Sequence, residues 1–171
     1  MFRQAVKEDL PALYTAFKKY LKTGDQSVTA RFTKDEDLMD YLNFNLTNPQ
    51  CLILVWPHEN GIKKIVGFMV LFAMKTPFLN VKDRIWLEVV WKDKSFKMIG
   101  FFKMAKKVIL DLAVSFGAGT VEGLIASDRP DLKRFYRMFG CTPRGEIVSF
   151  DVSQVIIKTQ AKDVSVIGTK N

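Results

Sequence analysis

Histidine and cysteine are scarce in this sequence. It contains one histidine, His58, and two cysteines, Cys51 and Cys141, which lie far apart in the chain. A zinc site needs several such side chains at close spacing, and a Ser/His or Cys/His nucleophile pair needs a histidine beside the nucleophile. The composition therefore predicts no metal site and argues against both nucleophile pairs. His58 falls in a predicted turn, which favours an exposed residue over a catalytic one.

Long apolar segments are also missing. The longest apolar run, Val66–Met74, is far shorter than the ~20 residues that a membrane-spanning helix needs. The segment Met1–Asp9 has no apolar stretch that could act as a signal peptide. We therefore expect a soluble protein in a reducing compartment, the cytoplasm, with no membrane partner.

Acidic residues are too few to balance the basic ones. The chain has 26 Lys and Arg against 18 Asp and Glu, which gives a formal net charge of +8. Residues 92–107 carry six lysines against Asp93, and residues 129–137 carry four basic residues against Asp131, so these two segments hold the whole excess. Such a surface attracts a nucleotide-like cofactor, nucleic acid or an acidic protein face, and charge alone does not choose between them.

The sequence does contain enough apolar material for one domain. Its 171 residues are 48% hydrophobic and include 14 Phe, which is sufficient for a substantial core. We place the domain at residues 1–155. Residues 156–171 are polar and weakly patterned, and we treat them as a C-terminal tail or an additional strand.

The first residues predict a short strand followed by a helix. Residues 1–6 alternate weakly between apolar and polar side chains. Asp9 stands where a helix N-cap belongs, and Pro11 falls in the first turn, where its missing N–H is not needed. Apolar residues then recur at helical spacing until Gly24, which is typical of a helix end.

A second helix and a hairpin follow. Thr33 with Glu36 three residues later is a capping-box pattern, and Pro49 ends the apolar stripe behind it. Residues 51–56 and 64–74 are rich in β-forming side chains and are joined by a turn that contains Asn-Gly. This arrangement predicts two antiparallel strands.

The second half alternates strands with helices. We predict strands at residues 85–90, 120–126 and 146–152, and helices at residues 96–116 and 130–139. The helix at 96–116 is apolar on a wide face and should be largely buried. A strand, helix, strand unit of this kind implies a right-handed crossover between parallel strands.

A lysine-rich turn, Trp91–Gly100, leads from a strand into this long helix. The start of a helix points free backbone N–H groups at one place, and the helix dipole adds partial positive charge there. With Lys92, Lys94 and Lys97 beside it, the turn could bind a phosphorylated ligand. The alternative is that these lysines only solvate the helix start.

The order of elements resembles that of the GNAT superfamily of acetyl-CoA-dependent N-acetyltransferases over about residues 1–155. Three passages carry the resemblance: Arg3–Ala5 with Asp9–Leu10 at the start, residues 85–116 in the cofactor segment, and Phe135–Cys141 at the end. The last is similar to the family's Phe-Tyr-x-x-x-Gly-Phe ending, with Cys141 in place of the final aromatic residue. The resemblance implies a single α+β or α/β domain in three layers, with a mixed sheet of six to seven strands and about four helices.

The phosphate turn departs from the family pattern Arg/Gln-x-x-Gly-x-Gly/Ala. Ser95, Met98 and Gly100 fall at the three specified places, and only Gly100 matches. Main-chain N–H groups can hold a diphosphate without glycine, although Met98 adds a side chain where the cofactor usually passes closest. The resemblance implies that acetyl-CoA binds to a set of neighbouring residues: Val90, Trp91, Lys94, Ser95, Lys97, Met98, Ile99 and Gly100.

The resemblance also suggests catalytic roles. Tyr136 matches the family's usual acid, which protonates the departing thiolate, and its alternative role is that of a core aromatic residue. Glu88 lies mid-strand between apolar neighbours and is the candidate base, although a salt bridge to a lysine would equally explain a carboxylate there. The N–H of Val90 or Trp91 would stabilise the developing oxyanion.

Three functions remain open at this point. The first is an N-acyltransferase that moves an acetyl group from acetyl-CoA to an unidentified amine on a small molecule or a protein. The second is a non-catalytic protein on the same scaffold, similar to internal or head-assembly proteins of tailed bacteriophages, which would contact other virion proteins and reside in the virion or the host cytoplasm. Nucleic-acid binding through the basic face ranks last, because no recognised binding motif supports it.

Overall fold

The computed structural model describes residues 1–22, 32, 34–58, 64–75, 83–96, 100–124, 133, 136–137, 140, 142–144 and 147–151. The helices within these residues are the 3₁₀ turn η1 (Lys7–Asp9) and the α-helices α1 (Leu10–Leu21), α3 (Asp35–Thr47) and α4 (Phe101–Phe116). The strands are β1 (Arg3–Gln4), β2 (Cys51–Pro57), β3 (Ile65–Met74), β4 (Arg84–Lys92), β5 (Thr120–Leu124), β6 (Thr142–Arg144) and β7 (Ile147–Asp151).

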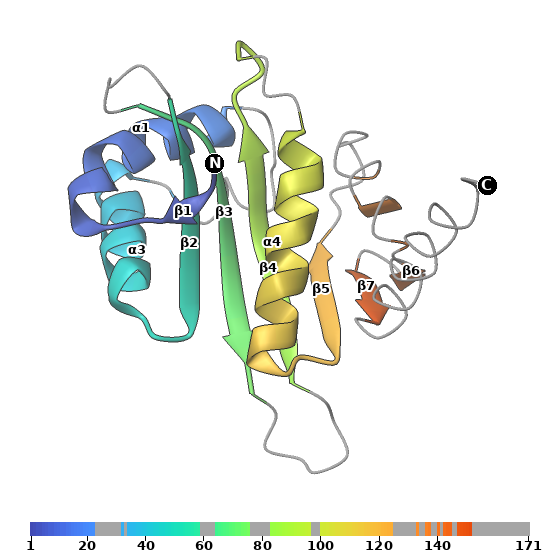
Figure 1. Cartoon of the computed structure of the whole chain (residues 1–171). Coiled ribbons are helices and arrows are strands. Elements are labelled where there is room, and N and C mark those ends of the chain that lie inside the picture. The colour runs from blue at the N-terminus through green and yellow to red at the C-terminus, as the bar shows by residue number, and fades with distance from the viewer. Residues whose placement is uncertain are drawn as a thin grey trace.

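The strands form one mixed sheet in the order β1-β2-β3-β4-β5-β7-β6 (Figure 1). A body of five strands, β1 to β5, continues at β5 into the two short strands β7 and β6. Every neighbouring pair is antiparallel except β4 and β5, which are parallel. The single-domain mixed fold that the sequence predicts is thus confirmed. The two strands that precede and follow the long helix in the chain, β4 and β5, are parallel as predicted.

The N-terminal strand is tied to the first helix by an ion pair. Both guanidinium nitrogens of Arg3 donate to the Asp9 carboxylate, at 2.6 and 2.7 Å, and the Val6 N–H donates to the same carboxylate at 2.9 Å. The hydrogen bond from Arg3 is the main reason that the pKa of Asp9 is lowered. Asp9 is the N-cap residue of α1, as predicted, but its carboxylate bonds backward to the preceding turn and not forward into the helix.

The second helix, α3, begins later than the capping-box pattern indicates. Its N-cap is Lys34, whose N–H donates to the Asp37 carboxylate at 3.0 Å. Asp37 therefore has the role that the sequence assigns to Glu36, and Thr33 lies outside the described residues. The hairpin of β2 and β3 is confirmed, with Leu54 opposite Met69 in the middle of the register.

The sheet separates two apolar layers. On one face, α1 and α3 pack against β2 and β3, around the fully buried rings of Phe17 and Phe68, whose centroids lie 5.0 Å apart. On the other face, α4 crosses β4 and β5 and buries its small residues Ala105 and Ala113 against the sheet (Figure 1). The three-layer arrangement agrees with the expected fold.

The long helix α4 starts five residues after the predicted position. It begins at Phe101 and not at Phe96, because its N-cap, Gly100, adopts a left-handed conformation with φ of 77° that breaks the helical path. Gly117, with φ of 71°, ends the helix in the same way, and its N–H donates to carbonyls of the last turn. Residues 97–99 are outside the described residues.

The end of the chain is described in part. The described residues contain three α-helices, whereas about four are predicted, and most of the expected helix at 130–139 lies outside them. Strand β7 agrees with the prediction to within one residue at each end. Strand β6 was not predicted, and the tail at 156–171 lies outside the described residues, so the boundary at 155 stays a prediction.

Candidate active site

The pairing of β4 with β5 that the structure describes ends halfway along β4. Their parallel register runs from Arg84–Thr120 to Leu87–Gly123 and ends there. Strand β4 continues to Lys92, whereas β5 ends one residue after Gly123. The region beyond the carboxyl ends of parallel strands is where ligands bind in many open sheets. We refer to the edge of β4 beyond the pair Leu87 and Gly123, on the β5 side, as the gap, and to that pair as its closed end.

Glu88 follows this pair directly and lies on a β-bulge. Val89 pairs with Val70, and Leu87 pairs with the next residue of β3, so Glu88 is the extra residue in β4. Bulges redirect side chains and often occur beside active sites. The half-buried Glu88 carboxylate accepts a hydrogen bond of 2.7 Å from Nε1 of Trp86. From the sequence we expect either a salt bridge to a lysine or a catalytic role for this carboxylate. The hydrogen bond from the Trp86 indole is not among these expectations.

The hydroxyl of Tyr136 lies at the end of the β4–β5 pairing. Tyr136 is 6% exposed and packs in the core on the α4 face. A Cβ added to Gly123 would collide with the Tyr136 hydroxyl and would lie 3.0 Å from the carbonyl oxygen of Leu87. Tyr136 is therefore both a core residue and a group at the closed end of the gap. The two roles that the sequence left open are compatible.

The strand register distinguishes between the two proposed main-chain donors. The N–H of Asp93 donates to the carbonyl of Val66 in β3 at 2.8 Å and continues the β3–β4 ladder. Because successive N–H groups point to opposite edges of a strand, the N–H of Trp91 also points to β3. The N–H groups of Val90 and Lys92 point to the other edge, toward the gap. Of the two proposed donors, only Val90 directs its N–H away from β3.

A buried carboxylate organises the turn after β4. Asp93 accepts from the N–H and the hydroxyl of Ser95, at 3.0 and 2.6 Å, and from Nζ of Lys19 on α1 at 2.9 Å. Burial opposes the charge on Asp93, but the hydrogen bonds from Ser95 and Lys19 outweigh it and lower the pKa to about 2. The Phe96 N–H also stays within the turn, 3.2 Å from the Asp93 carbonyl. The donors of Ser95, a predicted cofactor residue, are therefore already engaged.

Phe96 lies on the side of β4 away from the gap. Its ring packs edge-on against His58, with centroids 4.9 Å apart, and Nζ of Lys64 lies 4.4 Å from the ring centroid. Both contacts belong to the hairpin of β2 and β3, whereas the gap opens toward β5. Phe96 does not close the gap, and His58, expected to be an exposed turn residue, is half-buried against it.

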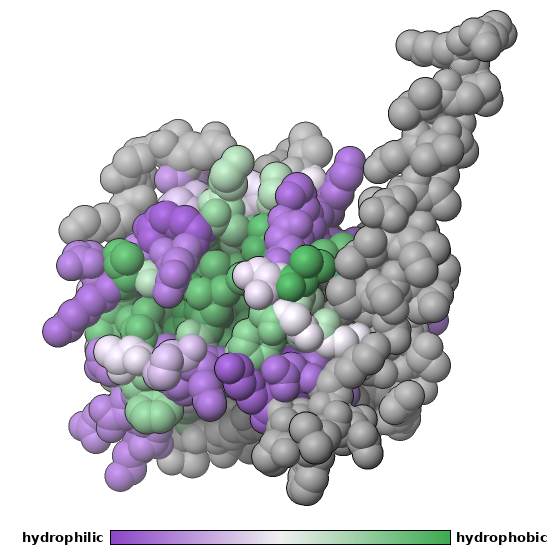
Figure 2. Space-filling view, turned by 60° about the horizontal axis from the view of Figure 1, so that its bottom comes forward, coloured by the Kyte–Doolittle hydropathy of each residue, from purple (hydrophilic) through white to green (hydrophobic). Residues whose placement is uncertain are grey.

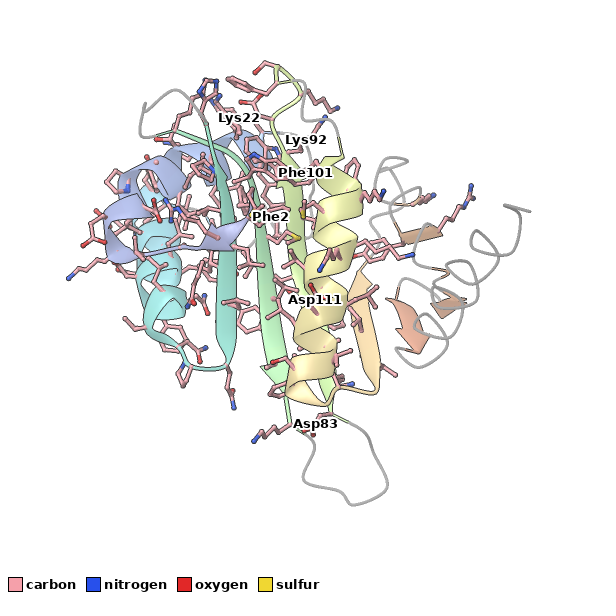
Figure 3. All side chains as sticks on the ribbon, in the orientation of Figure 1. Phe2, Lys22, Asp83, Lys92, Phe101 and Asp111 are labelled. Atoms are coloured by element: carbon pink, nitrogen blue, oxygen red, sulfur yellow. The ribbon has the colours of Figure 1, made fainter. Side chains whose placement is uncertain are left out.

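The start of α4 offers main-chain donors at the same end of the molecule. The Met104 N–H donates to the Gly100 carbonyl at 2.8 Å, so the N–H groups of Phe101 and Lys103 precede the hydrogen-bond ladder of the helix. Gly100 has open space around it, and Lys94 and Lys103 are exposed. Figure 3 shows Lys92, at the end of β4, and Phe101, at the start of α4, at this end. These groups fit a diphosphate, while the predicted residues Lys97, Met98 and Ile99 lie outside the described residues.

One hollow in the described part of the chain lies elsewhere. A groove of about 440 Å³ is lined by Leu52 and Ala73 on the sheet, Ile85 at the start of β4, and Leu112 and Phe116 near the end of α4. Figure 2 shows apolar side chains gathered between hydrophilic ones on this side of the molecule. The groove is at the opposite end of β4 and α4 from the gap, and it contains none of the predicted site residues.

The described part of the chain has neither a metal-binding cluster nor a membrane-spanning helix, and its described cysteine is a core residue. No group of three or more His, Cys, Asp or Glu side chains there is arranged to hold a metal ion. Burial, together with the nearby charge of Glu88, raises the pKa of the Cys51 thiol to about 12, so Cys51 is a neutral core residue. None of the described helices has the length and apolar character needed to cross a membrane.

Comparison with known proteins identifies the fold. No protein-family model matches the chain, and no curated protein matches it in sequence. The structure is similar to an N-acetyltransferase from Staphylococcus aureus Mu50, with a TM-score of 0.69, 17% identity, and coverage of 89% of this chain and 98% of that chain. It is also similar to a ribosomal-protein-alanine N-acetyltransferase from Brucella melitensis, with a TM-score of 0.68, 16% identity, and coverage of 88% and 99%.

A third similar structure is a tetramutant of the BH1408 protein from Bacillus halodurans, with a TM-score of 0.71, 15% identity, and coverage of 85% of this chain and 95% of that chain. Likeness at this level of identity shows the fold alone, and that fold is shared with these two N-acetyltransferases. The resemblance read from the order of elements is confirmed to that extent.

Two residues of the site were missed in the sequence. Gly123 is a lone glycine inside a strand pattern, which is a known sign that another group approaches the backbone closely. Trp86 stands two residues before Glu88 and therefore points to the same face of the strand, so its contact with Glu88 could have been expected from spacing. The ion pair of Lys19 with Asp93 has no comparable local signal.

Proposed function

We propose that this chain is a GNAT-type N-acyltransferase that moves an acetyl group from acetyl-CoA to a primary amine. The observation that carries the proposal is a coincidence of three features at one point. The pairing of β4 and β5 ends at Leu87 and Gly123, Glu88 follows on a bulge, and the Tyr136 hydroxyl lies against Gly123. An acid, a carboxylate and an opening in the sheet are the parts that an acyl transfer between two substrates needs.

Acetyl-CoA would supply an acetyl thioester, whose carbonyl carbon the amine attacks so that a C–N bond forms and the C–S bond breaks. Glu88 would accept the proton that the amine nitrogen loses. Tyr136 would donate its hydroxyl proton to the departing sulfur, a task suited to a phenol, whose ordinary pKa is about 10. The N–H of Val90, which points to the gap, would donate to the carbonyl oxygen.

The cofactor would be held at the start of α4. The N–H groups of Phe101 and Lys103 would receive the diphosphate, and the exposed lysines Lys94 and Lys103 would add charge attraction. Lys97, Met98 and Ile99 belong to the same proposed site through the resemblance. Ser95 would contribute less than expected, because its N–H and hydroxyl already bond to Asp93.

The turn after β4, which contains Ser95 and Phe96, favours a second candidate function. The N–H groups of Ser95 and Phe96 are satisfied within the turn, and Met98 replaces the glycine expected near the cofactor. Both facts would suit a non-catalytic protein on the same scaffold, for example an internal or head-assembly protein of a tailed-phage virion. The enzyme ranks first because a scaffold role does not require a carboxylate at Glu88 and a phenol hydroxyl at Gly123, both at the end of the β4–β5 pairing.

Binding of acetyl-CoA separates the two candidates. At 100 to 1,000 times its dissociation constant, acetyl-CoA should raise the free energy of unfolding by about 2.7 to 4.1 kcal/mol, measured by thermal denaturation. ATP at the same concentration is the control, since it shares the adenine and phosphates but has no thioester arm. An equal response to both nucleotides, or none to acetyl-CoA, would favour the non-catalytic protein. Release of free thiol in the presence of a primary amine then measures turnover.

A further inference from the structure

Glu88 lies at an irregular point of the sheet. It is the extra residue of the bulge in β4, and the described pairing of β4 with β5 ends one residue before it. A glutamate side chain has several rotatable bonds, and fixing them costs free energy. A base must nevertheless lie within hydrogen-bond reach of the proton it takes. A hydrogen bond to the Glu88 carboxylate that limits these rotations therefore serves a base.

Trp86 is placed to do this. Its Nε1 lies 2.7 Å from the Glu88 carboxylate, which is the short distance typical of a bond to a charged acceptor. Trp86 itself belongs to the regular part of the sheet, with Phe72 opposite in β3 and Glu122 opposite in β5. Glu122 is in turn held by Arg84 at 3.2 Å. The backbone of Trp86 is therefore held between two strands, and its indole N–H reaches the Glu88 carboxylate.

We propose that Trp86 is a positioning residue that holds the Glu88 carboxylate at the place from which it would take the amine proton. The inference rests on the proposed function, because it assigns Trp86 to the base of that same reaction. It also gives the indole N–H a task distinct from core packing. Trp56, by comparison, packs on the other face of the sheet against Phe2 and Phe101.

The contact can be tested without any activity. The chain has three tryptophans, so its ¹H–¹⁵N spectrum contains three indole signals, and Trp86→Phe identifies the one that belongs to Trp86. Glu88→Ala removes the acceptor and should shift the Trp86 indole signal while leaving those of Trp56 and Trp91 nearly in place. An unchanged Trp86 signal would overturn the proposal, because the indole would then have no bond to Glu88 in solution.

Kinetics test the positioning role. A hydrogen bond to a charged group is worth enough that Trp86→Phe should lower kcat by roughly 10- to 100-fold, with the affinity for acetyl-CoA unchanged. In a Glu88→Ala background, Trp86→Phe should cause no further loss, since the group it positions is gone. Trp56→Phe is the matched control and should keep the wild-type kcat.

The outcomes separate this inference from the proposed function. If the wild-type chain binds no acetyl-CoA and releases no thiol, the proposed function and the positioning role both fail. If the wild type is active and Trp86→Phe keeps its kcat, only the role of Trp86 fails. A loss in the Trp86→Phe variant that is equally large with and without Glu88 would show that the indole acts by packing, and would also overturn the inference.

Discussion

The hydroxyl oxygen of Tyr136 lies against the Cα of Gly123, so close that a single added carbon at residue 123 would overlap it. Gly123 is the last residue of β5 that pairs with β4, and its partner there is Leu87. The phenol therefore reaches the closed end of the gap only because this position has no side chain. The contact between Tyr136 and Gly123 therefore ties the packing of the core to the position of the proposed acid, the Tyr136 hydroxyl.

Gly123→Ala should destabilise the fold and displace the phenol. An extra methyl group in a packed site costs about 1 to 3 kcal/mol, and the methyl would meet both the Tyr136 hydroxyl and the Leu87 carbonyl. Urea denaturation measures the loss. In a Tyr136→Phe background the same substitution should cost less, because the hydroxyl is absent. An identical cost in both backgrounds would show that the hydroxyl does not lie against residue 123.

Tyr136→Phe should reduce turnover and spare cofactor binding. A positioned acid contributes on the order of 100- to 10,000-fold to a rate, and the ring that fills the core is retained. The measurements are kcat by thiol release and the dissociation constant of acetyl-CoA by calorimetry. Equal losses in both quantities would assign Tyr136 a packing role alone.

The two ends of α4 provide a matched pair of glycines. Gly100 and Gly117 have φ of 77° and 71°, and neither has a neighbouring atom within 4 Å of an added Cβ. Alanine at either position should cost a similar amount of stability, about 1 kcal/mol, because both must adopt a left-handed conformation. Only Gly100→Ala should also weaken acetyl-CoA binding, measured by calorimetry. Equal binding by the two variants would refute the placement of the diphosphate at the start of α4.

Asp93→Asn should lower stability at neutral pH. The folded chain lowers the pKa of Asp93 from 3.8 to about 2, and a shift of this size corresponds to roughly 2 kcal/mol. Because the folded pKa is the lower one, this stabilisation is complete above about pH 4 and is lost as the pH falls toward about 2. The free energies of unfolding of wild type and variant, measured by urea titration, should therefore differ at pH 7 and become equal as the pH falls toward about 2.

A control for this prediction lies on the surface of α4. Lys107 and Asp111 form an exposed ion pair of 2.7 Å one helical turn apart. Such pairs contribute little to stability, so Asp111→Asn should change the urea midpoint far less than Asp93→Asn does. Comparable effects from the two substitutions would mean that burial and the hydrogen bonds of Ser95 and Lys19 do not stabilise the charge on Asp93.

Most of the fold could be predicted from local patterns. The strands at 51–57, 65–74 and 84–92 were located to within two residues, because their apolar residues are bounded by clear turn residues. The start of α4 was placed too early because Phe96 continues the apolar spacing of the helix. Only the left-handed conformation of Gly100 shows that the helix cannot extend through it.

The candidate site was less accessible to sequence reasoning. Glu88 and Tyr136 were identified as candidates, but their meeting point depends on where the pairing of β4 and β5 ends, which is a property of the whole sheet. The choice of Val90 over Trp91 required the register with β3. The engagement of Ser95 follows from Asp93, whose partner Lys19 is 74 residues away in the chain. Contacts of this range leave no periodic signal.

The central claim is that the gap between β4 and β5 receives the acetyl thioester beside Glu88 and Tyr136. The most direct measurement is a ¹H–¹⁵N titration of the wild-type chain with acetyl-CoA. The account predicts that the amide signals of Val90 and Gly123 shift together with those of Phe101 to Lys103 at the start of α4. A titration that leaves Val90 and Gly123 unmoved, or that shifts only residues around the groove at Leu52 and Phe116, would contradict it.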